Sequence, residues 1–439
     1  MAPLPKNILI VGGGVFGLST ALSLSKRHPD SQVTLLEASP TIPNPHGSSV
    51  DSSRIIRADY SHPTYAKLAT EATDLWRRTE WGREGRYTQN GLLLVYPDGD
   101  STAKDYTTKS YHNVKELGED AQFLPTKADV LSAAPAYGDT LNVAGGYVNW
   151  SSGWADAEAG VRFAKQKLDE QGKVRFLTGQ VNRLLFSDKD NQTVTGVALA
   201  DNTTITADLV ILATGAWTAA LVDLRGRAVS TGQAIAYMRI SDEEQRQLEN
   251  MPTILNFATG IFIIPPRNNV LKIARHAYGY HNPKAVPVPG AGPGETMHVS
   301  LPEQGVPIPL EGETAFREAL KQLLPTFADR PFINTRICWY TDTPKGDFII
   351  TPHPSYPHLF LATGGSGHAY KFFPVIGDKV VDALEGTLAP ELRDLWAWPE
   401  AVDETQFEGT EDGSRSGAKK LLLLEELAKT KKAGRQGVL

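Results

Sequence analysis

The sequence has little of several features that mark particular protein classes. Cys338 is the single cysteine among 439 residues, so an internal disulfide is impossible and a reducing compartment is favoured. No uncharged apolar run approaches the roughly 18 residues that a membrane span requires. The formal net charge is -6, which gives no reason to expect nucleic acid or an anionic membrane surface as a partner.

The apolar N-terminal segment runs directly into a glycine-rich motif, so its cleavage as a signal peptide would destroy that motif. We therefore expect an intracellular, cytoplasmic protein. The terminal Gly-Val-Leu differs from the Ser-Lys-Leu signal of peroxisomal proteins. The chain is long enough for two domains, or for one domain with insertions.

The glycine motif is Gly12-x-Gly14-x-x-Gly17, and it follows an apolar strand at residues 7–11. Backbone amides at the start of the next helix can then face a pyrophosphate group without an intervening side chain. Glu37 ends a second strand, at a spacing that suits hydrogen bonds to ribose hydroxyls. This context predicts a bound adenine dinucleotide and leaves NAD and FAD open.

The middle of the chain gives weaker signals. The apolar run at 208–215, which ends at Gly215, indicates a buried parallel strand that stops beside a cofactor. We expect a helix over residues 63–82, mixed short strands and loops over 87–144, and a helix from Gly153 to about residue 170 that Asp156 caps.

Further predictions concern the rest of the chain. Residues 173–199 resemble a β-meander, and residues 229–335 read as further strands of a second domain. We expect a loop at 283–295, a helix at 312–324 and another helix around 420–425 in the C-terminal tail.

A late pair of segments decides between NAD and FAD. The first is Cys338-x-Tyr340-Thr, and the second runs from Gly364 through Gly365, Gly367 and His368 to Lys371. A strand that ends in a second glycine-rich turn would bring backbone amides to a flavin ring far from the adenine, which an NAD dehydrogenase does not need. FAD is therefore favoured.

With these segments the chain resembles the monomeric sarcosine oxidase family, whose relatives include pipecolate, saccharopine and fructosyl-amino-acid oxidases. The resemblance extends in order through about residue 390. It is carried by the glycine motif with Glu37, by Ser53-Arg54-Ile-Ile-Arg57, by Leu271-Lys272-Ile-Ala-Arg-His276 and by the two late segments.

The resemblance implies an α/β fold: a Rossmann-like FAD-binding domain with an inserted α+β substrate domain on a mixed or antiparallel sheet. The expected FAD-binding domain comprises 1–60, 150–228 and 336–390. The expected substrate domain comprises 61–149 and 229–335, and a tail with a helix covers 391–439.

The resemblance also implies FAD attached covalently through a thioether to Cys338, although most lone cysteines are small buried hydrophobes. The cofactor-binding residues that it implies are Gly12, Gly14, Val15, Phe16, Gly17, Glu37, Ser53, Arg54, Val181, Gly215, Cys338, Gly364, Gly365, Gly367, His368 and Lys371.

In the reaction that the resemblance implies, Arg57 and Lys371 hold the substrate carboxylate. Lys272 stabilises the charge that develops on oxygen, and the further catalytic residues are Arg54, His276 and Tyr340. The substrate is a secondary-amine amino acid of the N-methyl, pipecolate or saccharopine type. Hydride passes to the flavin, the imine is hydrolysed, and O2 is reduced to H2O2 by a monomeric enzyme.

Departures from the family keep alternatives open. The family's His-Gly-Asp-Thr is replaced by Val50-Asp-Ser-Ser53, and His276 stands where fructosyl-amino-acid oxidases tend to carry an acidic residue. Arg275 could meet a second carboxylate, as in saccharopine. The alternatives are a fructosyl-amino-acid oxidase, a biosynthetic oxidase with a cyclised product, an electron-transfer dehydrogenase and a catalytically silent nucleotide-binding protein.

Overall fold

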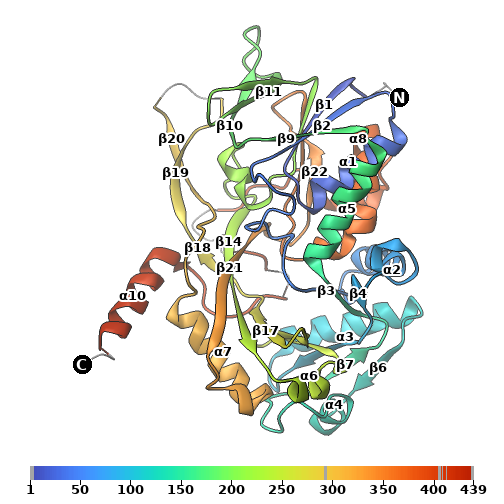
Figure 1. The fold of residues 1–439 in the computed structure, drawn as a ribbon, viewed down its shortest axis with the longest axis vertical. Helices are drawn as coiled ribbons and strands as arrows, with labels where there is room; N and C mark the ends of the chain where they lie inside the picture. Colours follow the sequence, from blue (N-terminus) through green and yellow to red (C-terminus); the bar gives the residue numbers. More distant parts are fainter. Residues whose placement is uncertain (1–3, 291–293, 404–406, 408, 412, 437–439) are drawn as a thin grey trace.

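A computed structural model describes residues 4–290, 294–403, 407, 409–411 and 413–436. Part of the predicted loop at 283–295 and the terminal tripeptide lie outside these residues. Figure 1 shows an elongated molecule in which one sheet region lies above another, with the last helix projecting at the lower left.

The upper region is built on a six-stranded sheet in which all neighbouring strands are parallel except the pair β22 and β23. Its strands, in spatial order, are β22 (Ile349–Pro352), β23 (Leu359–Thr363), β13 (Leu209–Leu212), β1 (Asn7–Val11), β2 (Gln32–Glu37) and β9 (Val174–Thr178). Helix α1 (Val15–Arg27) packs against α5 (Ala157–Gln171) and α8 (Phe373–Glu385). The predicted Rossmann-like fold is confirmed.

The lower region is built on a ten-stranded mixed sheet. Along its path lie β24 (Leu421–Leu422), β18 (Tyr280–His281), β14 (Val229–Arg239), β17 (Val270–Arg275), β16 (Ile261–Arg267), β15 (Thr253–Asn256), β5 (Leu92–Tyr96), β7 (Gly145–Asn149) and β6 (Ala121–Leu124). Strand β21 (Phe332–Asp342) pairs with β14 outside this path. Figure 1 shows these two long strands running between the two regions.

The predicted domain limits stay a prediction. Strand β21 crosses the limit set at residue 336, because its antiparallel pairing with β14 extends from Phe332 to Asp342. The strand that carries Cys338 is thus a member of the larger sheet, and after β21 the chain returns to the smaller sheet at β22.

The prediction of short strands and loops over 87–144 is wrong in part, because a long helix, α3 (Ser101–Glu116), and a short one, α4 (Lys127–Ala133), lie there. Helix α3 buries Ala103, Tyr106, Thr107, Ser110 and Val114. Small and polar residues make up most of this face, so the apolar periodicity by which a helix is recognised is weak.

Two predictions about strands also need correction. Strand β9 pairs with β2 in the parallel sheet, so the meander comprises only β10 (Val181–Phe186), β11 (Val194–Leu199) and β12 (Thr204–Thr206). In the predicted loop, β19 (Pro283–Pro287) pairs with β20 (Thr296–Ser300). Prolines are tolerated in such a two-stranded ribbon because their missing N–H groups can face outward.

Other helices lie close to the positions predicted from the sequence. Helix α2 (Pro63–Arg78) and helix α7 (Leu310–Leu323) lie where they were expected. The Asp156 side chain accepts a hydrogen bond from the Ala159 N–H at the start of α5, as predicted, although residues 153–155 form strand β8 (Gly153–Ala155). The tail ends in α10 (Leu423–Gln436), and α6 (Asp242–Leu248) was not predicted.

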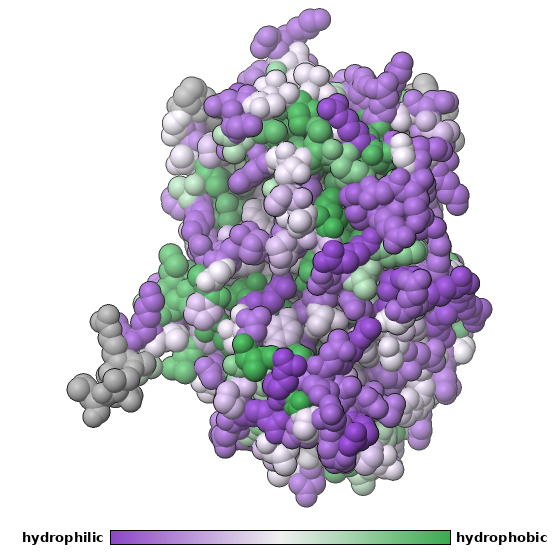
Figure 2. Space-filling model, in the orientation of Figure 1, coloured by the Kyte–Doolittle hydropathy of each residue, from purple (hydrophilic) through white to green (hydrophobic). Residues whose placement is uncertain are grey.

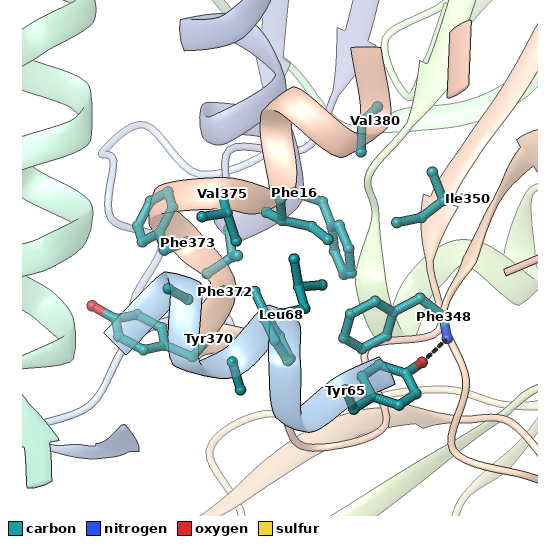
Figure 3. Packing of buried hydrophobic residues seen from close by; sticks show 14 of the residues in the cluster. Phe16, Tyr65, Leu68, Phe348, Ile350, Tyr370, Phe372, Phe373, Val375 and Val380 are labelled. Carbon is teal, nitrogen blue, oxygen red and sulfur yellow. Dashed lines mark hydrogen bonds between the residues drawn. The ribbon is translucent and has the colours of Figure 1, made fainter. Parts of the chain in front are cut away.

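An aromatic cluster joins the glycine motif to the late segments. The Phe16 ring, at the start of α1, meets the Phe348 ring edge-on at a centroid distance of 5.5 Å. Tyr65 of α2 lies edge-on to Phe348 at 5.7 Å, and its hydroxyl accepts a hydrogen bond from the Phe348 N–H at 3.4 Å. Figure 3 shows Phe372 and Phe373 in the same packing region. Four segments distant in sequence are thereby held together by one hydrophobic core.

The visible face is largely hydrophilic, with hydrophobic areas in patches between hydrophilic residues (Figure 2). Among the described residues, no helix combines the length and apolar character needed to cross a membrane.

The contact between α1 and α8 generates a prediction about stability. A Cβ atom added at Gly377 would lie 1.9 Å from the Ser19 carbonyl oxygen, so Gly377→Ala must push the two helices apart. We expect a loss of about 1–3 kcal/mol in the free energy of unfolding. Urea denaturation followed by circular dichroism measures it, and an unchanged midpoint would contradict this packing.

Candidate active site

Two cavities meet in the middle of the molecule. The larger has a volume of about 380 Å³ and lies beside the glycine motif and the carboxyl ends of β1, β2 and β13. The smaller has a volume of about 70 Å³ and lies against the larger sheet. The residues that line both are Arg54, Tyr340, Gly367, His368 and Tyr370. These shared residues mark the junction at which a ligand of the larger cavity would face the smaller pocket.

The glycine motif leaves no room for side chains. Gly12 has a φ of +109°, and a Cβ atom there would lie 2.4 Å from the Ala213 carbonyl oxygen. A Cβ atom at Gly17 would lie 1.8 Å from the Gly12 carbonyl oxygen. The Val15 N–H donates to the Ser49 hydroxyl at 3.0 Å. The motif therefore presents bare backbone to the larger cavity, which fits a pyrophosphate group.

Glu37 is buried at the end of β2 and lines the larger cavity. Its Oε2 atom accepts a hydrogen bond from the Gly13 N–H at 2.7 Å. Its Oε1 atom accepts from the Ser39 N–H at 2.9 Å and from Asn44 Nδ2 at 2.8 Å. The carboxylate thus ties the glycine motif to the loop after β2, and its predicted contact with a ribose stays a prediction.

The larger cavity brings together many of the residues expected to bind the cofactor. Those in its lining are Gly12, Gly14, Val15, Phe16, Glu37, Arg54, Val181, Gly215, Gly365, Gly367 and His368. The expected residues outside its lining are Gly17, Ser53, Cys338, Gly364 and Lys371. Sequence reasoning missed Gly13, Ser48, Ser49, Thr214, Trp217 and Tyr370, which also line it. Gly13 and Tyr370 lie within motifs that the sequence analysis recognised, between the positions that it selected, whereas no motif marks Ser48, Ser49 or Trp217.

One face of the larger sheet supplies the other wall. Side chains on a strand alternate between faces, and the strand registers place three rows side by side. The rows are Gln233, Ile235 and Tyr237 from β14; Lys272, Ala274 and His276 from β17 and the residue after it; and Arg336, Cys338 and Tyr340 from β21. Residues that are far apart in sequence thereby share one face of the sheet, and Gln233, Ile235, Ala274, His276 and Tyr340 among them line the smaller pocket.

Cys338 lies in the middle of this face with 1% of its surface exposed. It packs with Ile235 and Ala274, and Arg54 Nη2 lies 3.4 Å from its sulfur atom. Arg54 lines both cavities. The Cys338 sulfur lies outside their linings, directly behind the Arg54 guanidinium. The position is compatible with a bond to a ring held at the junction.

Arg57 is buried in the smaller pocket. Its Nη1 atom has no hydrogen-bond partner among the described residues, although it is fully buried. Its guanidinium lies over the Tyr60 ring, 4.7 Å from the centroid. Leaving a buried donor unsatisfied costs about 1–3 kcal/mol, more for a charged group, so this atom is suited to a ligand oxygen.

Lys371 ends a chain of hydrogen bonds in the same pocket. Its Nζ atom donates to the His368 carbonyl oxygen at 2.7 Å and to the Tyr60 hydroxyl at 2.8 Å. The His368 Nε2 atom must donate to the Gly346 carbonyl at 2.8 Å, so His368 Nδ1 accepts from the Tyr60 hydroxyl. Burial and the nearby Arg57 hold the pKa of Lys371 well below its usual value.

The C-terminal tail contributes a further cation, Arg415, which sequence reasoning missed. Its side chain is fully buried, and its Nη2 atom donates to Asp342 Oδ1 at 2.5 Å and to the Ser366 carbonyl at 3.0 Å. Arg415 Nη1 lies 3.3 Å from His276 Nδ1, and the guanidinium lies 5.1 Å from the Tyr340 centroid. No motif surrounds Arg415, so only the fold reveals it.

His276 is surrounded by polar groups of the tail. Its Nε2 atom lies 3.3 Å from the Ser414 hydroxyl, and burial together with Arg415 lowers the pKa of His276 well below its usual value. The imidazole is therefore neutral at physiological pH. Burial raises the pKa of Tyr340 above its ordinary value, so its hydroxyl keeps its proton.

Lys272 lies beside the junction and is outside the lining of both cavities. Its Nζ atom donates to the Ser53 carbonyl at 2.7 Å and pairs with Asp51 Oδ2 at 2.9 Å. Arg275, in contrast, pairs with Glu311 of α7 at 2.7 Å. That ion pair reduces its availability for a second substrate carboxylate. Among the described residues, no group of His, Cys, Asp or Glu side chains is arranged to hold a metal ion.

Comparisons with known proteins agree with this geometry. The chain is 32% identical to the amino acid oxidase imqH of Aspergillus flavus, over 90% of this chain and 98% of that protein. It is 30% identical to the L-saccharopine oxidase of Schizosaccharomyces pombe, over 90% and 93%. A solved fructosyl peptide oxidase from E. terrenum superposes with a TM-score of 0.84 at 26% identity, covering 97% of this chain and 98% of that chain.

The family comparison covers most of the chain. Residues 7–383 match the family described as FAD dependent oxidoreductase. This segment contains the glycine motif, the two cavities' principal walls and the late segments. The chain therefore belongs to the FAD dependent oxidoreductases, and within them to the group of amine and amino-acid oxidases that includes the sarcosine oxidases.

Proposed function

We propose that this protein is an FAD-dependent oxidase of a small secondary-amine amino acid, of the N-methyl, pipecolate or saccharopine type. The observation that carries the proposal is a small buried pocket, rich in cations, that adjoins the cavity suited to FAD. A ligand whose carboxylate occupies the cationic end would have its remaining atoms near the junction.

The cations would hold the carboxylate. Arg57 offers a buried, unpartnered Nη1 atom, and Lys371 lines the same pocket. A guanidinium fork binds a carboxylate through directed hydrogen bonds, and these are stronger when one partner is charged. Arg415 adds positive charge behind His276 and Tyr340. A neutral or cationic substrate without an acid group would leave this charge uncompensated.

The rest of the pocket favours an uncharged amine. Among the described residues that line it, none is Asp or Glu, so no carboxylate would stabilise an ammonium group. His276 and Tyr340 are both neutral and can orient an amine by hydrogen bonds. Bound flavin would supply the acceptor for electrons from the adjacent C–H bond. Lys272 would provide the fixed positive charge that favours O2 as the final acceptor.

Two further parts of the proposal concern the attachment of the cofactor and the division of the chain into two domains. We infer that FAD is bound covalently through Cys338, supported by its place between Arg54 and the sheet face. We also infer that the segments 1–60, 150–228 and 336–390 hold the cofactor while 61–149 and 229–335 shape the substrate pocket. The inference of a monomer rests on the resemblance to monomeric sarcosine oxidases.

A fructosyl-amino-acid oxidase is the second candidate. Its support is the fold of solved relatives such as the fructosamine oxidase of Aspergillus fumigatus, with a TM-score of 0.79 at 26% identity. A biosynthetic oxidase whose imine cyclises would use the same residues. A dehydrogenase with another electron acceptor would not need the charge of Lys272.

Peroxide formation by the purified yellow protein tests the function. The panel contains sarcosine, L-pipecolate, L-proline, L-saccharopine, N-methylated aromatic amino acids and fructosyl-valine, each with its decarboxylated counterpart as control. We expect peroxide with one acid and none with its control, since the cations need a carboxylate. Anaerobic bleaching of the flavin without peroxide would instead indicate a dehydrogenase. An absence of bleaching with every amine would refute the proposal.

Covalent attachment is tested by Cys338→Ala. In the parent protein we expect the flavin to remain with the pellet after acid precipitation, because a thioether survives denaturation. In the variant the flavin should move to the supernatant, which absorbance at visible wavelengths measures. If the variant's flavin also stays in the pellet, the link lies elsewhere.

Lys371 generates a prediction about protons. Because burial and Arg57 lower its pKa, the empty pocket favours the neutral amine, and a bound carboxylate should restore the ammonium form. We expect the uptake of up to about one proton per bound propionate near neutral pH. Calorimetric titration in two buffers of different ionisation enthalpy measures this uptake, which Lys371→Met should abolish. Equal heats for the parent protein in both buffers would contradict it.

A further inference from the structure

The segment Val50-Asp-Ser-Ser53, which departs from the family's sequence, carries a buried carboxylate that the proposed function does not use. The Asp51 side chain has no exposed surface. It lies at the end of the sheet face that carries Lys272, opposite the end that carries His276 and Arg415. We call Asp51, Arg54, Tyr237, Lys272 and Arg336 the Asp51 cluster.

Every contact of Asp51 in the cluster is polar. Oδ2 lies 2.9 Å from Lys272 Nζ and 2.5 Å from Arg54 Nη1. Oδ1 accepts hydrogen bonds from the Tyr237 hydroxyl and the Ser52 N–H, both at 2.7 Å. One carboxylate therefore ties together a residue of the cofactor junction, Arg54, and the lysine expected to act on oxygen.

The charges of the cluster explain why the carboxylate is needed. Burial favours the neutral form of Lys272, and the guanidinium of Arg54 acts in the same direction, so the pKa of Lys272 falls to about 8. Asp51 opposes both effects. Burial alone would raise the pKa of Asp51, but Lys272, Arg54 and Arg336 together lower it below its ordinary value, so Asp51 stays ionised.

The surroundings of Lys272 leave Asp51 as its direct carboxylate partner. The charged and titratable groups that face it are Asp51 and Arg54 from the segment around β3 (Arg54–Ile56), Tyr237 from β14, and Cys338 from β21. The Ser53 carbonyl accepts the other hydrogen bond of its ammonium. On β16, the Phe262 ring centroid lies 6.0 Å from Nζ.

We propose that Asp51 is a positioning residue, which holds the Lys272 side chain beside the cofactor junction and keeps its ammonium charged for the reaction with oxygen. The inference rests on the proposed function, because it assigns a support to the lysine of that reaction. Asp51 itself contacts Lys272 and Arg54 and is absent from the lining of both cavities.

The first test measures the proton on Lys272 without any substrate. Protein with 13C at the ε carbon of lysine is titrated by NMR, and Lys272→Met identifies the signal. We expect a midpoint near pH 8 in the parent protein. In Asp51→Asn the midpoint should fall by about one pH unit or more, since an opposite charge at this distance is lost. An unchanged midpoint would overturn the proposal.

Matched variants separate charge from structure. Ser52→Ala removes a hydroxyl that donates to Asp51 Oδ1 at 3.3 Å and leaves the carboxylate in place, so its midpoint should stay near that of the parent. Asp51→Glu should recover much of the parent midpoint. If Asp51→Asn does not fold, Asp51→Asn with Arg336→Gln removes one charge of each sign and takes its place, with a smaller expected fall because the loss of a nearby cation favours the ammonium form.

The second test follows the two half-reactions of the holoenzyme. With a substrate from the panel, Asp51→Asn at pH 7.5 should slow reoxidation by O2 by about threefold or more, while anaerobic flavin reduction changes much less. Lys272→Met should show the same pattern, and the reoxidation rate of the parent should fall as pH rises through about 8. Equal slowing of both half-reactions would count against a role in the oxygen step.

The two tests distinguish failure of the inference from failure of the proposed function. If no amine reduces the parent flavin, the proposed function fails, while the NMR titration still decides whether Asp51 controls the charge of Lys272. If substrate reduces the flavin but Asp51→Asn leaves both the midpoint and the reoxidation rate unchanged, the role of Asp51 alone is refuted.

Discussion

Buried positive charge is the constraint on which the site depends. A cation taken out of water is tolerated when a carboxylate or polar groups replace its hydration. Three buried carboxylates meet this need at different points: Asp51 pairs with Lys272 and Arg54, Asp342 pairs with Arg415, and Asp59 lies near Arg57. Tyr147, Asn149 and Ser152 each donate hydrogen bonds to Asp59 and fix it in turn. The charge that a substrate acid would meet is thus only partly neutralised by the protein.

The larger sheet turns this constraint into an ordered arrangement. Because alternate residues of β14, β17 and β21 share one face, a single surface carries the Asp51 cluster at one end and His276 with Tyr340 at the other. Cys338 lies between them. The Phe348 ring packs against Phe16, at the start of α1, and against Phe372, just after the late glycine-rich segment (Figure 3). In the proposed reaction, the end with the Asp51 cluster would serve the oxygen step, and the end with His276 and Tyr340 would orient the substrate amine.

The sequence allowed prediction of the features that depend on local pattern. The glycine motif, Glu37 and the apolar run at 208–215 specify the parallel sheet because each obeys a short-range rule of turn or strand. Helix α3 was not predicted because most residues of its buried face are small or polar, which weakens the apolar periodicity. Strand β19 was not predicted because its prolines are more typical of loops. Arg415 and Asp51 were missed for another reason. Their surroundings come from strands far away in the chain, and no local pattern records which distant carboxylate or cation they meet.

The tail position of Arg415 has a consequence for the order of assembly. During synthesis, β14, β17 and β21 leave the ribosome long before residue 415, and β24 then pairs with β18 just beyond it. Contacts between such distant segments form late, because the chain must close a long loop to make them. The polar wall around His276 is therefore completed last. A still growing chain can carry the glycine motif and the walls of the larger cavity before Arg415 is available to pack beside His276, so this part of the site depends on the tail.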